Sequence, residues 1–538
     1  MFGHLVPLDL TLIAVYFMAL FSVAFYFSRR EKTSAEYFLA GRKAGWLAIG
    51  ASLFASNISS EHFIGLAGSG SSRGLAVGHF EWLACFILLL LGWVFAPFYL
   101  NSGVYTMPEF LERRYGRASR IYLTSVSIVA YVLTKISVTV FAGSLLLNRV
   151  VGWDVATSAV VMVIVAGIYT VAGGLKAIVH VDVFQSAVLI LGATLLTILG
   201  LREVGGWGAL QQKVPADFFH MIKPVNDPEF PWTGILFGAP ILGIWYWCTD
   251  QYIVQRVLSG KDIDHARGGT ILAGFLKILP VFVLVLPGLI ACGLAGDPAL
   301  GDRAYPMLVA GNLLPPGLKG LVIASLLAAL ISSLASCFNS SSTLFTMDFY
   351  RQVRPPAGEK ELVLVGRLAT TALVILGILW VPFIRYISSQ IYIYLQSVQA
   401  YVSPPIAAVF LLGILWPRVN AKGAISSLGV GAFLGAARLV LELLHKAGRL
   451  HYAPLQRAAE INFLHFAAVL FVVSAAVLVV VSLATGRPPR NQVEGLTFGT
   501  TPVSLRRSND CNRSWHRLNV GMSIVLVVTV LFLYSRFL

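Results

Sequence analysis

The stretch SLFASNISSEHFIGLAGSG, residues 52–70, lies inside a run of sequence that is apolar enough to cross a membrane. It carries polar side chains in consecutive helical turns and then three glycines: Ser56, Asn57, Ser59, Ser60, Glu61 and His62, followed by Gly65, Gly68 and Gly70. The hydrocarbon core of a bilayer contains no water, so each polar group there needs an internal partner or a water-filled cavity. The stretch therefore predicts a membrane helix that is bent or broken around something polar.

The composition of the whole chain also indicates a membrane protein. Of its 538 residues, 57% are hydrophobic and 12% are charged, and the mean hydropathy is +0.77. A soluble domain of this size could not bury so much apolar surface. At about 20 residues per span, the sequence predicts fourteen membrane helices, near 9–28, 46–70, 80–101, 121–147, 153–174, 183–201, 233–254, 268–292, 316–346, 362–384, 390–416, 422–445, 462–485 and 519–537.

We therefore expect an all-α polytopic membrane protein with a single membrane-embedded domain. This domain comprises residues 1–485 and 519–538, and a basic segment rich in proline and glycine, residues 486–518, forms a cytoplasmic linker before the last helix. Four of the five cysteines lie in apolar segments, which argues against a disulfide framework.

The net charge of +15 comes from basic clusters that the predicted spans place on one side of the membrane. They are Arg29, Arg30, Lys32, Arg42 and Lys43; Arg113, Arg114, Arg117 and Arg120; Arg256, Lys261 and Arg267; Arg351, Arg354 and Lys360; and the run from Arg487 to Arg517. The positive-inside rule makes this side cytoplasmic and puts both termini outside a plasma or inner membrane. We therefore expect lipid, and not nucleic acid, around the chain.

A second polar pattern lies on one face of the ninth predicted span. Its residues are spaced i, i+3, i+4 and i+7: Ala329, Ser332, Ser333 and Ser336. Sodium is a hard cation that takes oxygen ligands, as calcium and magnesium do. Two serine hydroxyls, with backbone carbonyls freed near Ala55 and Ile58, would form an oxygen cage. The alternative is that the serines bond to their own helix or ease helix packing.

Two ionisable residues lie in or beside apolar spans. Glu81 begins the third span, and Lys277 lies in GFLKILP. Charges within a membrane are costly, are usually paired and are often functional. Together the two residues would offer an acceptor and a donor to a hydroxyl-rich ligand. The alternatives are that Glu81 lies in water at the interface and that Lys277 extends to the end of its span.

Further candidates are Asn57, His62 and Gln396, whose side chains can bond to hydroxyls, although such residues more often join helices to one another. Trp245, Tyr246 and Trp247 offer flat faces that suit a pyranose ring, or they form core. Asp182, at the start of the sixth predicted span, either caps that helix or supports a sodium exit path. Interruptions in the second, seventh and eleventh spans point to a transporter binding site.

Several function classes lack support in the sequence. It contains no GxxxxGK[ST] loop for an ATP-driven pump and no metal-ligand spacing such as HExxH. Glu81 and His62 resemble an acid–base pair, but no nucleophile or cofactor motif accompanies them. We therefore expect neither an enzyme nor an organic cofactor. A membrane sugar sensor that does not transport remains an alternative, although no output domain is attached.

Motifs along nearly the whole chain resemble the sodium/solute symporter family, and in particular its sodium–glucose cotransporter branch. They are ASNISSEHFIGLAGSG (55–70), FEW (80–82), GVYTMPEFLERRYG (103–116), TVAGGLKAIVHVDVFQ (170–185), WYWCTDQYIVQR (245–256), GFLKILP (274–280), SSLASCFNSSSTLFTMDFY (332–350) and PPIAAVFLLGILW (404–416). The resemblance implies a LeuT-like core of two inverted five-helix repeats with discontinuous helices. It also implies sodium-coupled import by alternating access.

The resemblance further implies roles for individual residues. The family's sugar contacts fall on Asn57, His62, Glu81, Trp247, Lys277 and Gln396, with Tyr246 closing the inner side. Its sodium site falls on the carbonyls of Ala55 and Ile58 and on Ala329, Ser332 and Ser333. Asp182 matches an acidic residue linked to sodium handling, whereas Glu61 has no ligand role in this assignment.

The chain departs from the family pattern at Gly243, Gln399, His79 and Ala335. Ala335 replaces a threonine of members that bind two sodium ions, so we expect one sodium per sugar. SSEHFIGLAGSG also resembles the myo-inositol branch, whereas FEW and SSLAS are closer to the hexose branch. We expect a sodium-driven importer of glucose or galactose with no obligatory protein partner, and a sodium/myo-inositol symporter is the main alternative.

Overall fold

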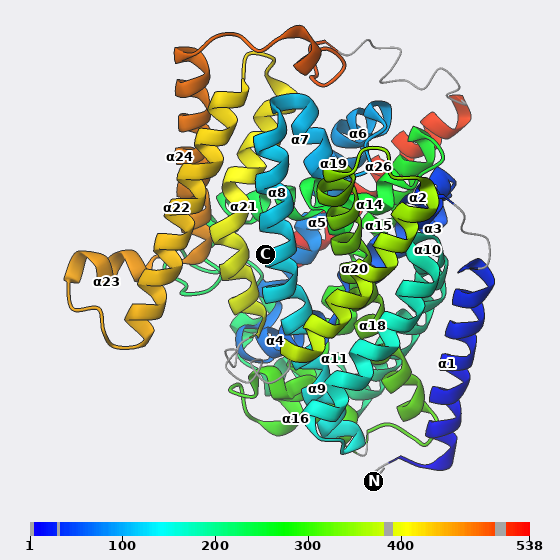
Figure 1. Ribbon diagram of the computed structural model, residues 1–538. Helices are drawn as coiled ribbons and strands as arrows, with labels where there is room; N and C mark the ends of the chain where they lie inside the picture. The colour runs from blue at the N-terminus through cyan, green and yellow to red at the C-terminus, as the bar shows by residue number, and fades with distance from the viewer. Residues whose placement is uncertain (1–4, 29–32, 312, 381–390, 501–512, 538) are drawn as a thin grey trace.

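The computed structural model describes residues 5–28, 33–311, 313–380, 391–500 and 513–537 (Figure 1). These residues form helices joined by loops, and none of them belongs to a named strand. Figure 1 shows the long helices lying side by side as a bundle, with the first described residues of α1 at its lower end and α7 at its upper end. The expected all-α class is confirmed.

The helices have the following bounds. In the first half of the chain they are α1 (Pro7–Ser28), α2 (Ser34–Leu39), α3 (Trp46–Asn57), η2 (Glu61–Leu66), α4 (Ala67–Arg73), α5 (His79–Leu90), η4 (Leu91–Phe95), α6 (Ala96–Ser102), α7 (Met107–Tyr115), α8 (Arg117–Ala130), η5 (Tyr131–Ile136), α9 (Ser137–Val151), α10 (Val155–Val204) and α11 (Trp207–Lys213). In the second half they are α12 (Trp232–Phe237), α13 (Ala239–Gly243), η7 (Ile244–Thr249), α14 (Gln251–Leu258), α15 (Ile263–Leu276), η8 (Val281–Val285), α16 (Leu286–Ala295), α17 (Ala304–Ala310), α18 (Leu318–Leu344), η10 (Phe345–Tyr350), α20 (Glu359–Trp380), α21 (Ile391–Leu415), α22 (Ala421–Lys446), α23 (Ala453–Glu460), α24 (Phe463–Ala484) and α26 (Arg513–Arg536).

Eleven helices among the described residues are long and apolar enough to cross a membrane. Two of them, Glu61–Ser102 and Val155–Val204, each extend over two of the fourteen predicted spans. The seventh predicted span falls on the short helices α12, α13, η7 and α14. The end of the predicted span 362–384, the first residue of 390–416 and the linker residues 501–512 lie outside the described residues. The number fourteen therefore stays a prediction.

The long helix α10 changes direction at Gly174, where two predicted spans meet. Its backbone there is left-handed (φ 48°, ψ −156°), a conformation that favours glycine. A Cβ atom at Gly174 would also lie 2.5 Å from the carbonyl oxygen of Tyr37. Gly174 therefore allows both the kink and the close approach of α2.

Two helices are interrupted within the membrane-spanning bundle, and the interruptions have the same geometry. The helix α3 ends at Asn57, and Ile58 is extended (φ −74°, ψ 116°). The helical turn η7 ends at Thr249, and Asp250 is extended in the same way (φ −77°, ψ 126°). The first interruption lies in the second predicted span and the second in the seventh, five spans later. This confirms the expectation of discontinuous helices.

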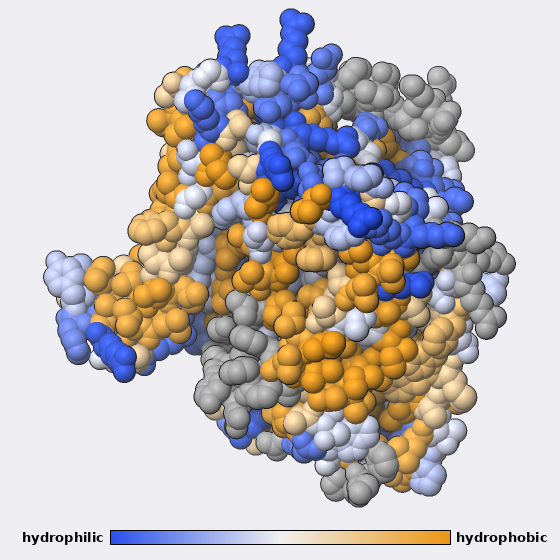
Figure 2. Space-filling model, in the orientation of Figure 1, coloured by the Kyte–Doolittle hydropathy of each residue, from blue (hydrophilic) through white to orange (hydrophobic). Residues whose placement is uncertain are grey.

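The exterior of the bundle carries the apolar belt that a membrane protein requires. Figure 2 shows hydrophobic residues along the sides of the helices and hydrophilic residues gathered at the end where α7 lies. Large apolar side chains are exposed along these sides, such as Leu368, Phe433 and Val472. Inside, one buried apolar cluster extends from Tyr16 in α1 to Val530 in α26.

The described parts of the two chain ends are each hydrogen-bonded to a distant segment of the chain. The carboxylate of Asp9 in α1 accepts the backbone N–H groups of Gly317 and Gly320 at the start of α18, both at 2.8 Å. Near the other end, Phe537 O accepts the backbone N–H of Met221. Of the predicted basic residues, Arg29, Arg30, Lys32, Arg506 and Arg507 lie outside the described residues.

Candidate functional site

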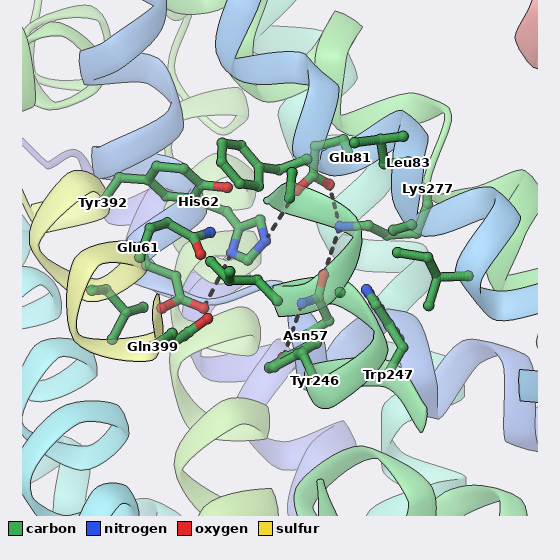
Figure 3. Close-up of a pocket in the computed structure, with 18 of the residues that line it drawn as sticks. Asn57, Glu61, His62, Glu81, Leu83, Tyr246, Trp247, Lys277, Tyr392 and Gln399 are labelled. Atoms are coloured by element: carbon green, nitrogen blue, oxygen red, sulfur yellow. Dashed lines mark hydrogen bonds and ion pairs between the residues drawn. The ribbon is translucent and has the colours of Figure 1, made fainter. Parts of the chain in front are cut away.

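A polar cavity of about 60 Å³ lies in the interior of the bundle, where the two interrupted helices meet (Figure 3). Its walls come from α3, η2, α5, η5, α13, η7, α21 and the residue at the end of α15. All seven residues predicted to contact a sugar line this one cavity: Asn57, His62, Glu81, Tyr246, Trp247, Lys277 and Gln396. The structure therefore brings together side chains that are up to 339 positions apart, from Asn57 to Gln396.

Lys277 and Glu81 form a buried ion pair on the cavity wall. Lys277 Nζ pairs with Glu81 Oε2 and donates to Asn57 Oδ1 at 2.7 Å. The relative exposure is 1% for Lys277 and 2% for Glu81. The alternatives of an interfacial Glu81 and of a Lys277 that reaches water at the end of its span are therefore wrong.

Asn57 connects the two interrupted helices directly. It is the last residue of α3, and its Nδ2 donates to the hydroxyl of Tyr246 in η7 at 2.9 Å. The neighbouring Trp247 lies under the cation of the buried pair, with Lys277 Nζ 5.6 Å from its ring centroid. The rings of Tyr246 and Trp247 are nearly perpendicular, at 86°. The amide, the ammonium and two aromatic faces thus border the same cavity.

His62 lies between two carboxylates. Its Nε2 is 3.5 Å from Glu81 Oε1, and its Nδ1 is 3.8 Å from Glu61 Oε1. The backbone N–H of Ser59 donates to His62 Nδ1 at 3.4 Å. The π-helical turn η2, which follows the interruption, supplies both Glu61 and His62.

Lys135 and Glu61 form a second ion pair on the cavity wall that the sequence reasoning missed. Lys135 Nζ, in η5, donates to Glu61 Oε1 at 3.2 Å, and the relative exposure is 6% for Lys135 and 5% for Glu61. Lys135 lies in YVLTKISV (131–138), and the rule for charges within a membrane that pointed to Lys277 applies equally there. Glu61 was given no ligand role, yet the structure places its carboxylate on the cavity wall.

The predicted sodium-site residues lie at the contact between α3 and α18. The hydroxyls of Ser56 and Ser336 are 2.9 Å apart, so residues next to Ala55 and Ile58 touch the serine face of α18. The hydroxyls of Ser333 and Tyr252 are also 2.9 Å apart. Tyr252 donates to the Ser56 carbonyl, which is another link to the end of α3. Ala55, Ile58, Ala329, Ser332 and Ser333 are all buried.

Asp182 is the acidic residue of this second polar region. It is fully buried and accepts hydrogen bonds from Ser332 Oγ at 2.6 Å and from Ser52 Oγ. It lies eight residues after the kink at Gly174 and within the helical part of α10, so the interpretation of Asp182 as a helix cap is wrong. The predicted start of the span was misplaced because the apolar sequence does not reveal where α10 bends.

Arg256 does not belong to the basic surface on which the sequence analysis placed it. Its relative exposure is 0%, and its Nε donates to Ser56 Oγ at 3.2 Å. Arg256 Nη1 donates to the carbonyl of Tyr252. The guanidinium is therefore an internal cation beside the Asp182 region, and it helps to fix Ser56 at the end of α3.

The oxygen ligands available to a cation in this region are hydroxyls, backbone carbonyls and the Asp182 carboxylate. Within the described ranges, no group of three or more His, Cys, Asp and Glu residues could hold a metal ion. Oxygen ligands suit a hard cation better than zinc or another transition metal, which takes nitrogen or sulfur ligands more readily. The chemistry of these residues fits sodium as a transported ion.

Comparison with known proteins identifies the family of the chain. The family model of the sodium:solute symporter family matches residues 37–431. The chain belongs to this family. Membership makes the protein a membrane transporter and not an enzyme, and it makes sodium the coupling ion.

Similar proteins match over most of their length. The chain is 42% identical to the sodium/mannose cotransporter of Bos taurus, over 99% of this chain and 97% of the relative. It is 40% identical to sodium/glucose cotransporter 1 of Oryctolagus cuniculus, over 93% of this chain and 82% of the relative. It is 39% identical to the sodium/myo-inositol cotransporter of Canis lupus familiaris, over 91% and 75%.

Solved structures support the expected fold. A sodium-coupled sialic acid symporter, solved in a substrate-bound outward-open state, matches with a TM-score of 0.76 and 22% identity. The match covers 89% of this chain and 98% of that structure. Mhp1, a nucleobase-cation-symport-1 family transporter, matches with a TM-score of 0.54. The LeuT-like arrangement expected from the sequence is therefore confirmed.

Proposed function

We propose that the protein is a sodium-coupled symporter that imports a hexose, glucose or galactose, by alternating access, with one sodium ion per sugar. The observation that carries this proposal is the cavity in which the buried Lys277–Glu81 pair, the Asn57 amide and the Tyr246 and Trp247 rings meet. It lies where two interrupted helices meet, which is where many transporters bind their substrates.

The cavity has the chemistry that a pyranose needs. Glu81 accepts from sugar hydroxyls, Lys277 donates to them, and Asn57 does both. Gln396 and His62 add further polar groups to the cavity lining. A hydroxyl that enters a buried site without a partner costs free energy, so this density of donors and acceptors favours a polyhydroxylated ligand. Trp247 and Tyr246 offer aromatic faces to the C–H face of the ring.

Sodium binds at the contact between α3 and α18. Its ligands are the carbonyls of Ala55, Ile58 and Ala329 and the hydroxyls of Ser332 and Ser333. A serine hydroxyl has one proton and two lone pairs. Because Ser332 gives its proton to Asp182, its lone pairs stay available to a cation. Asp182 thus orients a sodium ligand and supports the path by which the ion leaves.

The one-to-one stoichiometry rests on Ala335 in α18. Family members that bind two sodium ions have a threonine at this position, and an alanine offers no hydroxyl to a second ion.

The coupling between the two ligands follows from the interruption at Ile58. Sodium binds the carbonyls of Ala55 and Ile58, and the sugar binds the side chain of Asn57, which lies between them in the chain. Sodium therefore orders the backbone segment that presents Asn57 to the sugar. Such coupling is reciprocal, so the sugar also raises sodium affinity. A membrane potential of about 100 mV adds about 2.3 kcal/mol for each sodium charge moved inward.

The protein lies in the plasma or inner membrane, with the basic end of the bundle in the cytoplasm and both termini outside. The gathering of hydrophilic residues at the α7 end supports this orientation (Figure 2). Residues 1–485 and 519–538 form one domain, with residues 486–518 as a cytoplasmic linker. Membrane lipid is the surrounding partner, and transport requires no second protein.

Uptake into proteoliposomes tests this proposal. We expect labelled glucose or galactose to accumulate under an inward sodium gradient and not under a matched potassium gradient, and a negative interior to increase the rate. Mannose and myo-inositol are compared in the same vesicles, because relatives carry these names. Accumulation that does not depend on sodium would refute symport. Binding without uptake would indicate a sensor, and faster uptake of myo-inositol than of any hexose would make the protein a polyol symporter.

A further inference from the structure

The substrate cavity contains two buried lysine–glutamate pairs, and the proposed function uses only one of them. Glu81 and Lys277 form the first pair, and Glu61 and Lys135 form the second. All four side chains line the same cavity, and none has a relative exposure above 6%. The second pair therefore needs its own explanation.

The two pairs lie on opposite sides of the cavity. Figure 3 shows Glu61 and Gln399 on one side of the drawn pocket and Lys277 and Trp247 on the other. His62 lies between the two carboxylates, with Nδ1 3.8 Å from Glu61 and Nε2 3.5 Å from Glu81. A ring-shaped ligand in the cavity thus has one charged pair facing each of its two edges.

A purely structural role does not account for the second pair. Breaking a buried ion pair is costly, but replacing the whole pair with apolar side chains is often neutral or stabilising. A pair that only joined η2 to η5 would thus have no advantage over apolar contacts, and no reason to face a cavity. An ammonium group has three N–H donors, and the bond to Glu61 accounts for one of them. The pair therefore has hydrogen-bonding capacity that a ligand in the cavity can use.

Lys135 also contacts the aromatic residues that border the cavity. Its Nζ lies 4.6 Å from the ring centroid of Tyr246 and 5.4 Å from that of Tyr252. These rings fix the ammonium without satisfying it as an acceptor would. Tyr246 in turn accepts from Asn57, so both charged pairs are connected to the same aromatic side chain.

We propose that Glu61 and Lys135 form a second sugar-recognition site in the cavity, which binds hydroxyls on the ring edge opposite to the edge bound by Glu81 and Lys277. This inference rests on the proposed function. It makes Glu61 and Lys135 specificity-determining residues, which select ring compounds that carry hydroxyls at both edges. A ligand with hydroxyls at only one edge binds through Glu81 and Lys277 alone and is disfavoured.

A series of deoxy sugars separates the two sites. The full-length wild type, Glu61→Gln and the matched control Glu81→Gln are reconstituted, and glucose and its monodeoxy analogues compete with labelled substrate at saturating sodium. In the wild type, removal of a hydroxyl that bonds a charged group weakens binding by about 10- to 100-fold. In Glu61→Gln we expect the loss of affinity caused by removing a hydroxyl to become smaller for the hydroxyls that bind Glu61 and Lys135, and to stay the same for the other hydroxyls. In Glu81→Gln we expect the reverse: the loss becomes smaller only for the hydroxyls that bind Glu81 and Lys277.

Lys135→Arg provides a second test, because it keeps the charge but changes the geometry of the donors. We expect it to alter the penalties for the same hydroxyls as Glu61→Gln, and this variant decides the question if Glu61→Gln does not fold. A uniform loss of affinity for glucose and every analogue, or no change for any of them, would overturn the inference and leave the proposed function intact. A wild type that takes up none of the sugars with sodium would overturn the proposed function itself.

Discussion

Variants of the Lys277–Glu81 pair should separate the stability of the protein from its ability to transport sugar. In Lys277→Met the side chain keeps its length, but Glu81 loses its cation and Asn57 Oδ1 loses a donor at 2.7 Å. Both partners are buried, so solvent cannot replace the lost contacts. Breaking a buried pair by removing one partner costs about 3–5 kcal/mol. We expect a clear fall in the thermal unfolding midpoint and no sodium-dependent sugar uptake.

The double variant Lys277→Met/Glu81→Gln is the matched control, because it removes the unpaired charge together with its partner. Replacement of a whole buried pair is close to neutral, so most of the lost stability should return while uptake stays absent. Unfolding is followed in detergent by size-exclusion chromatography after heating, and uptake is followed in proteoliposomes. If the double variant is as unstable as the single one, or if Lys277→Met unfolds at the wild-type temperature, the buried-charge reasoning is refuted.

Three other outcomes follow from described contacts. Ser333→Ala removes a proposed sodium ligand, and we expect about a 10-fold higher half-saturating sodium concentration with little change in sugar affinity at saturating sodium; unchanged sodium dependence of uptake would remove Ser333 from the site. Gly174→Ala places a Cβ atom 2.5 Å from the carbonyl oxygen of Tyr37, at a residue whose φ is 48°. We expect it to lower the free energy of unfolding by more than about 1 kcal/mol. A melting temperature equal to that of the wild type would contradict this. The Thr157 hydroxyl and nearby backbone N–H groups lower the pKa of Asp154, which caps α10, below its usual 3.8. The cap therefore stabilises the fold fully above pH 3.8, and this stabilisation is lost as the pH falls through the lower pKa of the folded state. The melting temperature of Asp154→Ala should therefore fall less on acidification than that of the wild type.

The sequence predicted the fold because the physical rules of the membrane leave few alternatives. Polar residues at 56–62 within hydrocarbon required an interruption, and the structure has one at Ile58. The same rule identified Glu81 and Lys277, and the structure pairs them. Each of these residues costs free energy when it lies in hydrocarbon, and the sequence shows this cost without knowledge of the residues packed around it.

The errors concern residues whose neighbours come from distant parts of the chain. Arg256 looked like a surface charge, since its partner Ser56 lies 200 positions away in the sequence. Asp182 looked like a helix cap because the residues on both sides of Gly174 are mostly apolar, so the sequence does not show that the helix bends at Gly174 and continues through Asp182. Glu61 was set aside because nothing in the sequence connects it to Lys135, 74 positions later. Such pairings depend on how the helices pack, which periodicity does not encode.

The contact between Asp9 and the start of α18 has a mechanical consequence. A carboxylate at the positive end of a helix dipole fixes that end to α1. Ser332 lies fourteen residues further along α18, which is about 20 Å at 1.5 Å per residue. With one end held as a pivot, a tilt of about 5° swings Ser332 by about 2 Å, close to the length of a cation–oxygen contact. Because α18 is held at this end, a rotation smaller than most helix crossing angles is enough to form or break the coordination shell of the ion.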